Sequence, residues 1–216
     1  MVVNTCGFLD SAKTESLNAI GEALNENGKV IVTGCLGSTP EFIRDSHPNV
    51  MAIAGPQKFN EVLDSIMQNI PIKSNPFEAK PSSSYVKLTP RHYSYLKISE
   101  GCNHKCSFCI VPSLRGPLKS RSMASILSEA KSLVERGTKE LLIISQDTSA
   151  YGLDLKFEET LVNGKKLKTN IYNLVRELAS LGIWVRLHYI YPYPHVKQLI
   201  PLMLSLIHIS EPTRLS

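Results

Sequence analysis

The segment "SEGCNHKCSFCIVPSLRG", residues 99–116, holds three of the five cysteines of the chain. Cys102, Cys106 and Cys109 follow one another with the spacing Cys-x-x-x-Cys-x-x-Cys. The segment comes directly after "YSYLKIS", residues 93–99, whose apolar and β-forming residues predict a strand. Three thiols in one loop at a strand end predict a metal centre or a catalytic site, unless the compartment favours disulfides.

Composition predicts a cytoplasmic globular protein. The chain has 216 residues, of which 43% are hydrophobic and 20% charged. No apolar run reaches the roughly 18 residues that a membrane helix needs, and the start "MVVNTCGFLD" does not have the pattern of a signal peptide. We therefore expect no membrane partner and reduced thiols rather than disulfides. The net charge of +5 is compatible with a ribosomal or nucleic-acid partner, and equally with an evenly solvated surface.

Residues 1–70 alternate strand and helix patterns. "MVVNT", "KVIVTG" and "VMAIAG" predict three strands, and the helix after the first is expected to be capped by Asp10 or Ser11 and to end at Asn27-Gly28. This order predicts an open parallel sheet covered by helices. The proline- and serine-containing stretch 71–92 predicts a linker.

Residues 93–203 predict a second domain of repeated strand and helix units. Strands are expected in "YSYLKIS", "KELLIIS" and "IWVRLHYI", a helix capped by Ser122 after the cysteine loop, and a turn at "VNGKK". The predicted fold class is α/β, with an N-terminal βαβ open-sheet domain followed by an incomplete (β/α) partial barrel. In such a barrel the functional loops lie at the carboxyl ends of the strands.

The cysteine spacing favours an iron–sulfur cluster over zinc. Structural zinc normally takes four ligands in two distant pairs, and His104 is poorly placed to bind together with its neighbouring cysteines. A 4Fe–4S cluster is normally held by four thiolates, so three leave one iron open. That iron can bind the amino and carboxylate groups of S-adenosylmethionine, and an electron from the cluster can then release a 5′-deoxyadenosyl radical. Structural zinc remains the alternative.

Three segments, "GCNHKCSFCIVPSLRG", "LLIISQDTSAYG" and "RLHYIYPYPHV", together resemble the radical S-adenosylmethionine (SAM) methylthiotransferases. The resemblance covers residues 1–203 and is strongest to the branch that modifies a ribosomal protein. It implies a methylthio group placed on the β-carbon of an aspartate in a small-subunit ribosomal protein, with two 4Fe–4S clusters, SAM, an electron donor and a sulfur source. The branch that modifies adenosine in transfer RNA shares the cysteines and is the first alternative. A non-catalytic iron–sulfur or zinc module is the second.

The remaining cysteines, Cys6 and Cys35, each follow a predicted strand of the first sheet, which places both at the same end. A lone cysteine is most often a buried core thiol. The resemblance instead implies that these two bind the second cluster. It also implies a third ligand upstream of "VVNTCGF", which we expect to be absent because the chain starts too late.

Both ends of the chain are expected to be incomplete. "LSLIHISEPTR" resembles translated sequencing adapter, so residues 204–216 are expected to be foreign. The resemblance further implies that the rest of the barrel and a small C-terminal β-barrel domain are missing. The isolated chain is therefore expected to be inactive.

Polar residues near the strand ends complete the predicted site. Gln146 and Asp147 follow "LLIIS" and are expected to hydrogen-bond SAM, and Arg115 is expected to pair with a carboxylate of the cofactor or the substrate. Arg186 and His188 alternate along one strand and share a face. Arg186, like Arg115, is expected near the mouth of the barrel, where it would supply a cation for the substrate carboxylate. A structural and a functional role for His188 are both left open. The tyrosines of this region are interpreted as packing residues: Tyr151, Tyr189, Tyr191 and Tyr193.

Overall fold

The computed structural model describes residues 1–56, 58–69 and 89–205, which form two compact units. One unit contains the described residues of Met1–Lys80 together with His104–Gly116, and the other those of Pro81–Asn103 and Pro117–Ser216. Most of the predicted linker lies outside the described residues, so the boundary remains a prediction. The segment His104–Gly116 groups with the N-terminal residues rather than with the rest of residues 93–203. The predicted domain bounds stay a prediction.

The first unit is an open parallel sheet with helices, as predicted. Its strands follow the order β1-β2-β3, and the register aligns Thr5 at the end of the first strand with Gly34 at the end of the second. The strands are β1 (Val2–Thr5), β2 (Ile31–Gly34) and β3 (Ala52–Ile53). The helices are α1 (Asp10–Asn27), α2 (Pro40–Ser46), α3 (Phe59–Asn69) and α4 (Val111–Arg115).

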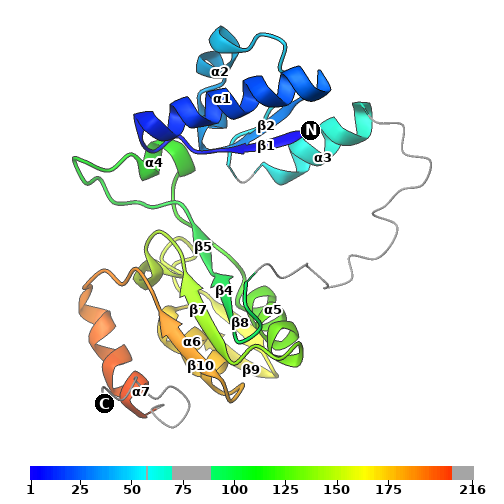
Figure 1. The fold of residues 1–216 in the computed structure, drawn as a ribbon. Helices are drawn as coiled ribbons and strands as arrows, with labels where there is room; N and C mark the ends of the chain where they lie inside the picture. Colours follow the sequence, from blue (N-terminus) through cyan, green and yellow to red (C-terminus); the bar gives the residue numbers. More distant parts are fainter. Residues whose placement is uncertain (57, 70–88, 206–216) are drawn as a thin grey trace, which may run out of the picture. The chain divides into compact units, whose positions relative to one another are not determined.

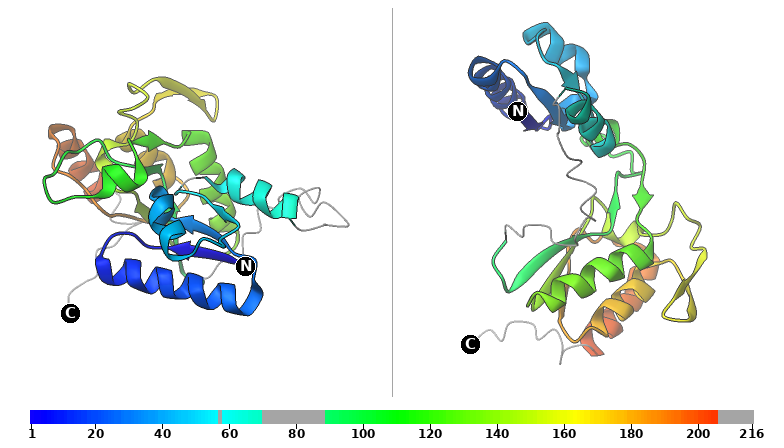
Figure 2. Two further views of the ribbon diagram at one scale, coloured as in Figure 1. Left: turned by 90° about the horizontal axis from the view of Figure 1, so that it is seen from above. Right: turned by 90° about the vertical axis from the view of Figure 1, so that its right-hand side faces the viewer.

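Helices cover both faces of this sheet, as Figures 1 and 2 show. On one face Val32 packs in a core with Ile20 of α1 and Ile43 of α2. On the other face Ile31, the preceding residue of β2, packs with Val62 of α3. Neighbouring residues of one strand thus enter different cores, because side chains of a strand alternate between its faces.

The ends of α1 confirm one prediction and correct another. Gly28 caps the C-terminus with φ 66°, and its N–H donates to the Leu24 carbonyl at 2.8 Å. The predicted cap at Asp10 or Ser11 is wrong, because Leu9 occupies the N-cap position without a side-chain bond and Asp10 is already helical. The Asp10 carboxylate instead accepts from the Lys13 ammonium at 2.9 Å, and this bond lowers the pKa of Asp10.

The second unit contains a parallel sheet in the order β10-β7-β4. Its strands are β4 (Tyr93–Lys97), β7 (Glu140–Ile144) and β10 (Trp184–Leu187), and its helices are α5 (Met123–Glu135), α6 (Ile171–Ala179) and α7 (Leu199–Ser205). Two small antiparallel pairs join them: β5 (Ser99–Glu100) with β6 (Lys119–Ser120), and β8 (Glu159–Val162) with β9 (Lys165–Lys168). The α/β class and the parallel sheets are confirmed, and within the described residues this sheet is open rather than a closed barrel.

One face of the second sheet forms the core of this unit. Leu96, Leu141, Ile143 and Val185 are buried there, in one cluster with residues of the helices α5 and α6. Figure 2 shows the ribbons of these two helices beside the sheet. Because side chains of a strand alternate between its two faces, the side chains at the strand positions between these buried residues lie on the opposite face of the sheet.

Ser122 caps α5 as predicted, accepting a hydrogen bond from the Ser125 N–H at 3.3 Å.

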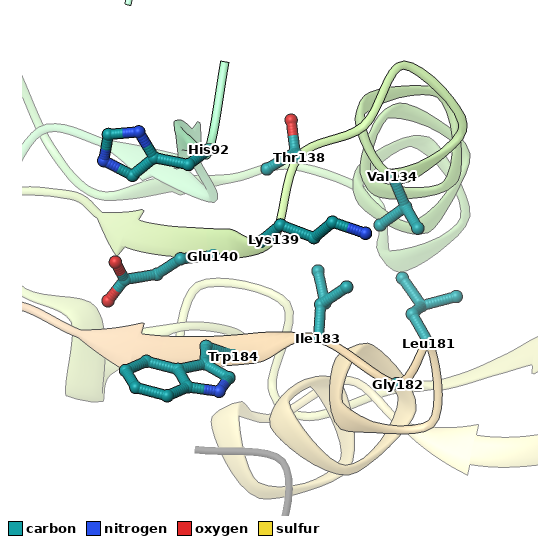
Figure 3. A pocket seen from close by; sticks show the side chains of 9 residues that line it. All are labelled: His92, Val134, Thr138, Lys139, Glu140, Leu181, Gly182, Ile183 and Trp184. Atoms are coloured by element: carbon teal, nitrogen blue, oxygen red, sulfur yellow. The ribbon is translucent and has the colours of Figure 1, made fainter. Parts of the chain in front are cut away.

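A pocket of about 480 Å³ lies at the amino-terminal edge of this sheet (Figure 3). His92, Lys139, Glu140 and Trp184 lie around it, beside apolar side chains at the ends of α5 and α6. This edge is opposite to the carboxyl edge, where the predicted site residues follow the strands.

None of the helices in the described residues has the length and apolarity needed to cross a bilayer.

Tyr151 gives the second unit a testable pH dependence. The residue is fully buried, its hydroxyl donates to the Arg121 carbonyl at 2.9 Å, and burial raises its pKa. In the unfolded chain the phenol ionises near pH 10, so the folded state loses stability as the pH rises above that value. We expect Tyr151→Phe to show a weaker loss of unfolding free energy between pH 9 and pH 11 in denaturant titrations, and an equal pH dependence in the two proteins would contradict this.

Candidate functional site

The cysteine loop has no regular structure between β5 and α4. Residues 101–110 contain no helix or strand, and the Cys109 N–H donates to the Cys106 carbonyl at 3.0 Å. Cys106 is exposed, whereas Cys102 and Cys109 are half-buried. Cys102 belongs to the second unit and the other two to the first, so the loop connects the two units.

The loop fits an iron–sulfur cluster by its donor chemistry. All five cysteines of the chain are free thiols, and the three in the loop are at least partly accessible. Thiolates are the preferred protein ligands of iron–sulfur clusters. Within the described residues, no three His, Cys, Asp or Glu side chains stand together as a formed metal site. The assignment of Cys102, Cys106 and Cys109 therefore rests on residue type and spacing.

Cys6 and Cys35 lie at the carboxyl edge of the first sheet. The last register pair of β1 and β2 is Thr5 with Gly34, and each cysteine is the next residue along its strand. Cys6 is exposed, and its backbone N–H and carbonyl both bond to the Ser16 hydroxyl, at 3.0 and 3.1 Å. Cys35 is buried and begins a 3-10 helix, Cys35–Ser38. The expected common end of the sheet is thus found, while a role in a second cluster remains a prediction.

The helix that follows the cysteine loop packs close to Cys35. The Ser38 hydroxyl, at the end of the 3-10 helix that Cys35 begins, donates to the Leu114 carbonyl of α4 at 2.9 Å. Leu114 is buried, and Arg115 ends the same helix. The first unit therefore contains four of the five cysteines, and the contact between Ser38 and Leu114 explains why the loop joins this unit.

At the carboxyl edge of the second sheet, Asp147 is held by a tyrosine. The Tyr193 hydroxyl donates to Asp147 Oδ2 at 2.9 Å. Burial, and after it the bond to the carboxylate, raise the pKa of Tyr193, so the phenol remains a donor. Tyr193 was interpreted from the sequence as a packing residue, and the structure adds that its hydroxyl is a hydrogen-bond donor to the predicted site residue Asp147.

Loops after β7 and β10 are joined by further bonds. The Ser149 hydroxyl donates to the Tyr191 carbonyl at 2.9 Å and lies 2.7 Å from the Tyr191 nitrogen. His195 Nε2 lies 2.9 Å from the Ser149 carbonyl oxygen, and the Thr148 N–H donates to the Tyr189 carbonyl at 3.1 Å. This network orders the segment that carries Gln146 and Asp147.

Arg186 is not at the predicted position. Its Nε donates to Glu140 Oε1 at 2.6 Å, and Glu140 is the first residue of β7. The guanidinium therefore extends toward the amino edge of the sheet, where an acidic partner neutralises its charge. Arg115 belongs to the first unit and Gln146 to the second, so their joint role remains a prediction.

Comparisons with known proteins agree with this chemistry. The family model of the radical SAM superfamily matches residues 96–210. A ribosomal protein uS12 methylthiotransferase RimO from Ruegeria pomeroyi is 61% identical over 203 residues, covering 94% of this chain and 44% of that protein. The protein of the same name from Brucella anthropi is 59% identical, covering 94% and 46%. The chain thus spans less than half the length of these curated relatives.

A solved structure shares the fold. The radical S-adenosylmethionine methyltransferase TsrM from Kitasatospora setae superposes with a TM-score of 0.52 at 15% identity, covering 83% of this chain and 40% of that one. At this identity the likeness concerns the fold alone. Because the family model covers more than half of the residues and includes the three-cysteine loop, the chain belongs to the radical SAM superfamily, which implies a 4Fe–4S cluster and SAM.

Proposed function

We propose that the protein is a methylthiotransferase that modifies an aspartate of a small-subunit ribosomal protein. The observation that carries this proposal is the 58–61% identity, along almost the whole chain, to relatives named as uS12 methylthiotransferases. The same proposal implies an electron donor and a sulfur source as partners. Modification of transfer RNA is the competing outcome.

In this proposal Cys102, Cys106 and Cys109 hold the first cluster, with one iron left for SAM. The bound cluster and SAM together supply the radical that removes hydrogen from the substrate carbon, because acid–base side chains cannot activate such a bond. Cys6 and Cys35 contribute ligands to a second cluster. The register of β1 and β2 supports this assignment, because it brings both cysteines to one edge of the sheet.

The polar residues near the strand ends are proposed to bind SAM and the substrate and to orient them. Gln146 and Asp147 hydrogen-bond SAM, and the bond from Tyr193 restricts Asp147 to one orientation. Arg115 pairs with a carboxylate of the cofactor or of the substrate aspartate. The bonds between the loops after β7 and β10 reduce the conformational freedom of these groups before a ligand binds.

A chimera tests the proposed substrate. The chain replaces the segment that it matches in the Ruegeria pomeroyi relative, so that the remaining length is supplied by a protein 61% identical to it. The reconstituted chimera receives SAM, a reductant, a sulfide source, a uS12 peptide and transfer RNA. We expect mass spectrometry to find the methylthio group on the peptide aspartate and not on a nucleoside.

The matched control is the same chimera with Cys109→Ala, which should modify neither substrate. Label on the nucleoside alone would assign the chain to the transfer-RNA branch. Cluster binding without cleavage of SAM would favour a non-catalytic iron–sulfur module.

A further inference from the structure

A short pair of strands closes the loop that carries the three cysteines. The strands β5 and β6 lie on either side of this loop in the sequence and pair antiparallel, with Ser99 opposite Ser120 and Glu100 opposite Lys119. We call this pair the stem of the cysteine loop. The stem fixes the place at which the chain leaves for the loop and returns from it.

One side chain extends the stem toward the cysteines. The amide oxygen of Asn103 accepts the Leu118 N–H at 2.9 Å, although the two residues are 15 positions apart. Asn103 is the residue directly after Cys102, and Leu118 is the residue directly before Lys119 of β6. The hydrogen bond therefore joins the departing and the returning chain at the base of the loop.

The returning side of the stem is anchored to the loop after β7. The Ser120 N–H and hydroxyl donate to the two carboxylate oxygens of Asp154 at 2.8 and 2.6 Å. The Gly152 N–H donates to the same hydroxyl at 2.9 Å. Because Leu118 is also buried, its N–H offers a fixed donor to Asn103. The bond from Leu118 thus restricts the backbone that follows Cys102.

The restraint on this side of Cys102 adds to what β5 provides. Gly101 separates β5 from Cys102 and has φ 74°. Glycine rotates more freely than any other residue, so β5 alone does not fix the direction of the Cys102 thiol. Asn103 is itself exposed, so its side chain is not part of an apolar core. Its hydrogen bond is the contribution that the structure assigns to it.

A cluster site that is not preformed gains most from such a restraint. Among the residues that the structure describes, the loop thiols do not stand together as a formed metal site, so the loop rearranges when a cluster binds. A loop with joined ends loses less conformational freedom in that step. Residues that orient metal ligands through hydrogen bonds strengthen metal binding.

We propose that Asn103 is a positioning residue, whose bond to Leu118 holds Cys102 at the base of the loop and slows the loss of the first cluster. The inference rests on the ligand assignment of the proposed function. It extends that assignment to a residue outside the three cysteines.

The rate of iron loss to a chelator tests this role. Each variant is made in the Cys6→Ala/Cys35→Ala background, reconstituted without oxygen, and mixed with an excess of a ferrous chelator. We expect Asn103→Ala to lose iron about tenfold faster than the same background with Asn103 intact. Asn103→Asp keeps an accepting oxygen in the same place and should lose iron at nearly the original rate.

Asn170→Ala is the matched control. Asn170 Oδ1 accepts the Asn173 N–H at 2.8 Å at the start of α6, so the variant removes the same kind of hydrogen bond in the same unit but outside the cysteine loop. It should leave the rate of iron loss unchanged.

Three results would overturn the inference: an unchanged rate in Asn103→Ala, a fast loss in Asn103→Asp, or an equally fast loss in Asn170→Ala. If the background with Asn103 intact took up no iron at all, the ligand assignment itself would be contradicted, and the inference with it.

Discussion

Replacing Cys106 with alanine is expected to remove the first cluster, with a loss of about four iron and four sulfide per chain after anaerobic reconstitution. Cys106 is an exposed free thiol in the middle of the three-cysteine loop. Two thiolates are too few to retain a cubane that already lacks a fourth protein ligand. Chemical analysis of iron and sulfide, together with the visible absorption of the cluster, measures the loss.

Two controls make this result specific. Cys106→Ser retains size and polarity but offers a poorer ligand for iron, so it should behave like Cys106→Ala. Cys6→Ala removes an exposed thiol at the edge of the first sheet and should leave the first cluster intact. Full iron content in Cys106→Ala would sink the ligand assignment, and a zinc content of one atom per chain without iron would favour the structural-zinc alternative.

Gly34→Ala is expected to destabilise the first unit by about 3 kcal/mol. Gly34 has φ 99°, a backbone conformation that glycine adopts at little cost and other residues avoid. A Cβ there would overlap the Thr5 carbonyl oxygen and the Asn4 side chain of the neighbouring strand. The strand ends that carry Cys6 and Cys35 would have to separate. Chemical denaturation, followed by hydrogen exchange of the β1 and β2 amides, measures the effect.

Gly28→Ala is the matched comparison for this prediction. Gly28 also has a positive φ, 66°, but a Cβ there would meet nothing within 4 Å. Its substitution should therefore lower the free energy of unfolding only because alanine disfavours a positive φ, by about 1 kcal/mol. Equal losses of unfolding free energy in the two variants would show that the close packing around Gly34 does not contribute to the effect of Gly34→Ala.

Local patterns predicted much of the fold. The strands of both sheets were expected from apolar runs, and Gly28 and Ser122 were found at the predicted helix ends. The cap at Asp10 or Ser11 failed because the helix starts earlier and Asp10 pairs with Lys13 instead. Helix boundaries depend on such local competition, which periodicity does not resolve.

Contacts between segments far apart in the chain could not be predicted from local sequence patterns. The bond from Ser38 to Leu114 joins residues 76 positions apart and draws the segment after the cysteines into the first unit. Arg186 was expected near a substrate carboxylate, but a neighbouring strand supplies Glu140 as its partner.

The central claim is that Cys102, Cys106 and Cys109 hold a cluster with one iron open to SAM. Electron paramagnetic resonance of the reduced, reconstituted chain tests it most directly, on the Cys6→Ala/Cys35→Ala double variant so that the signal comes from the loop alone. The account predicts a cluster spectrum whose g values shift when SAM is added, because the cofactor binds to the open iron. A cluster spectrum that is identical with and without SAM would contradict it.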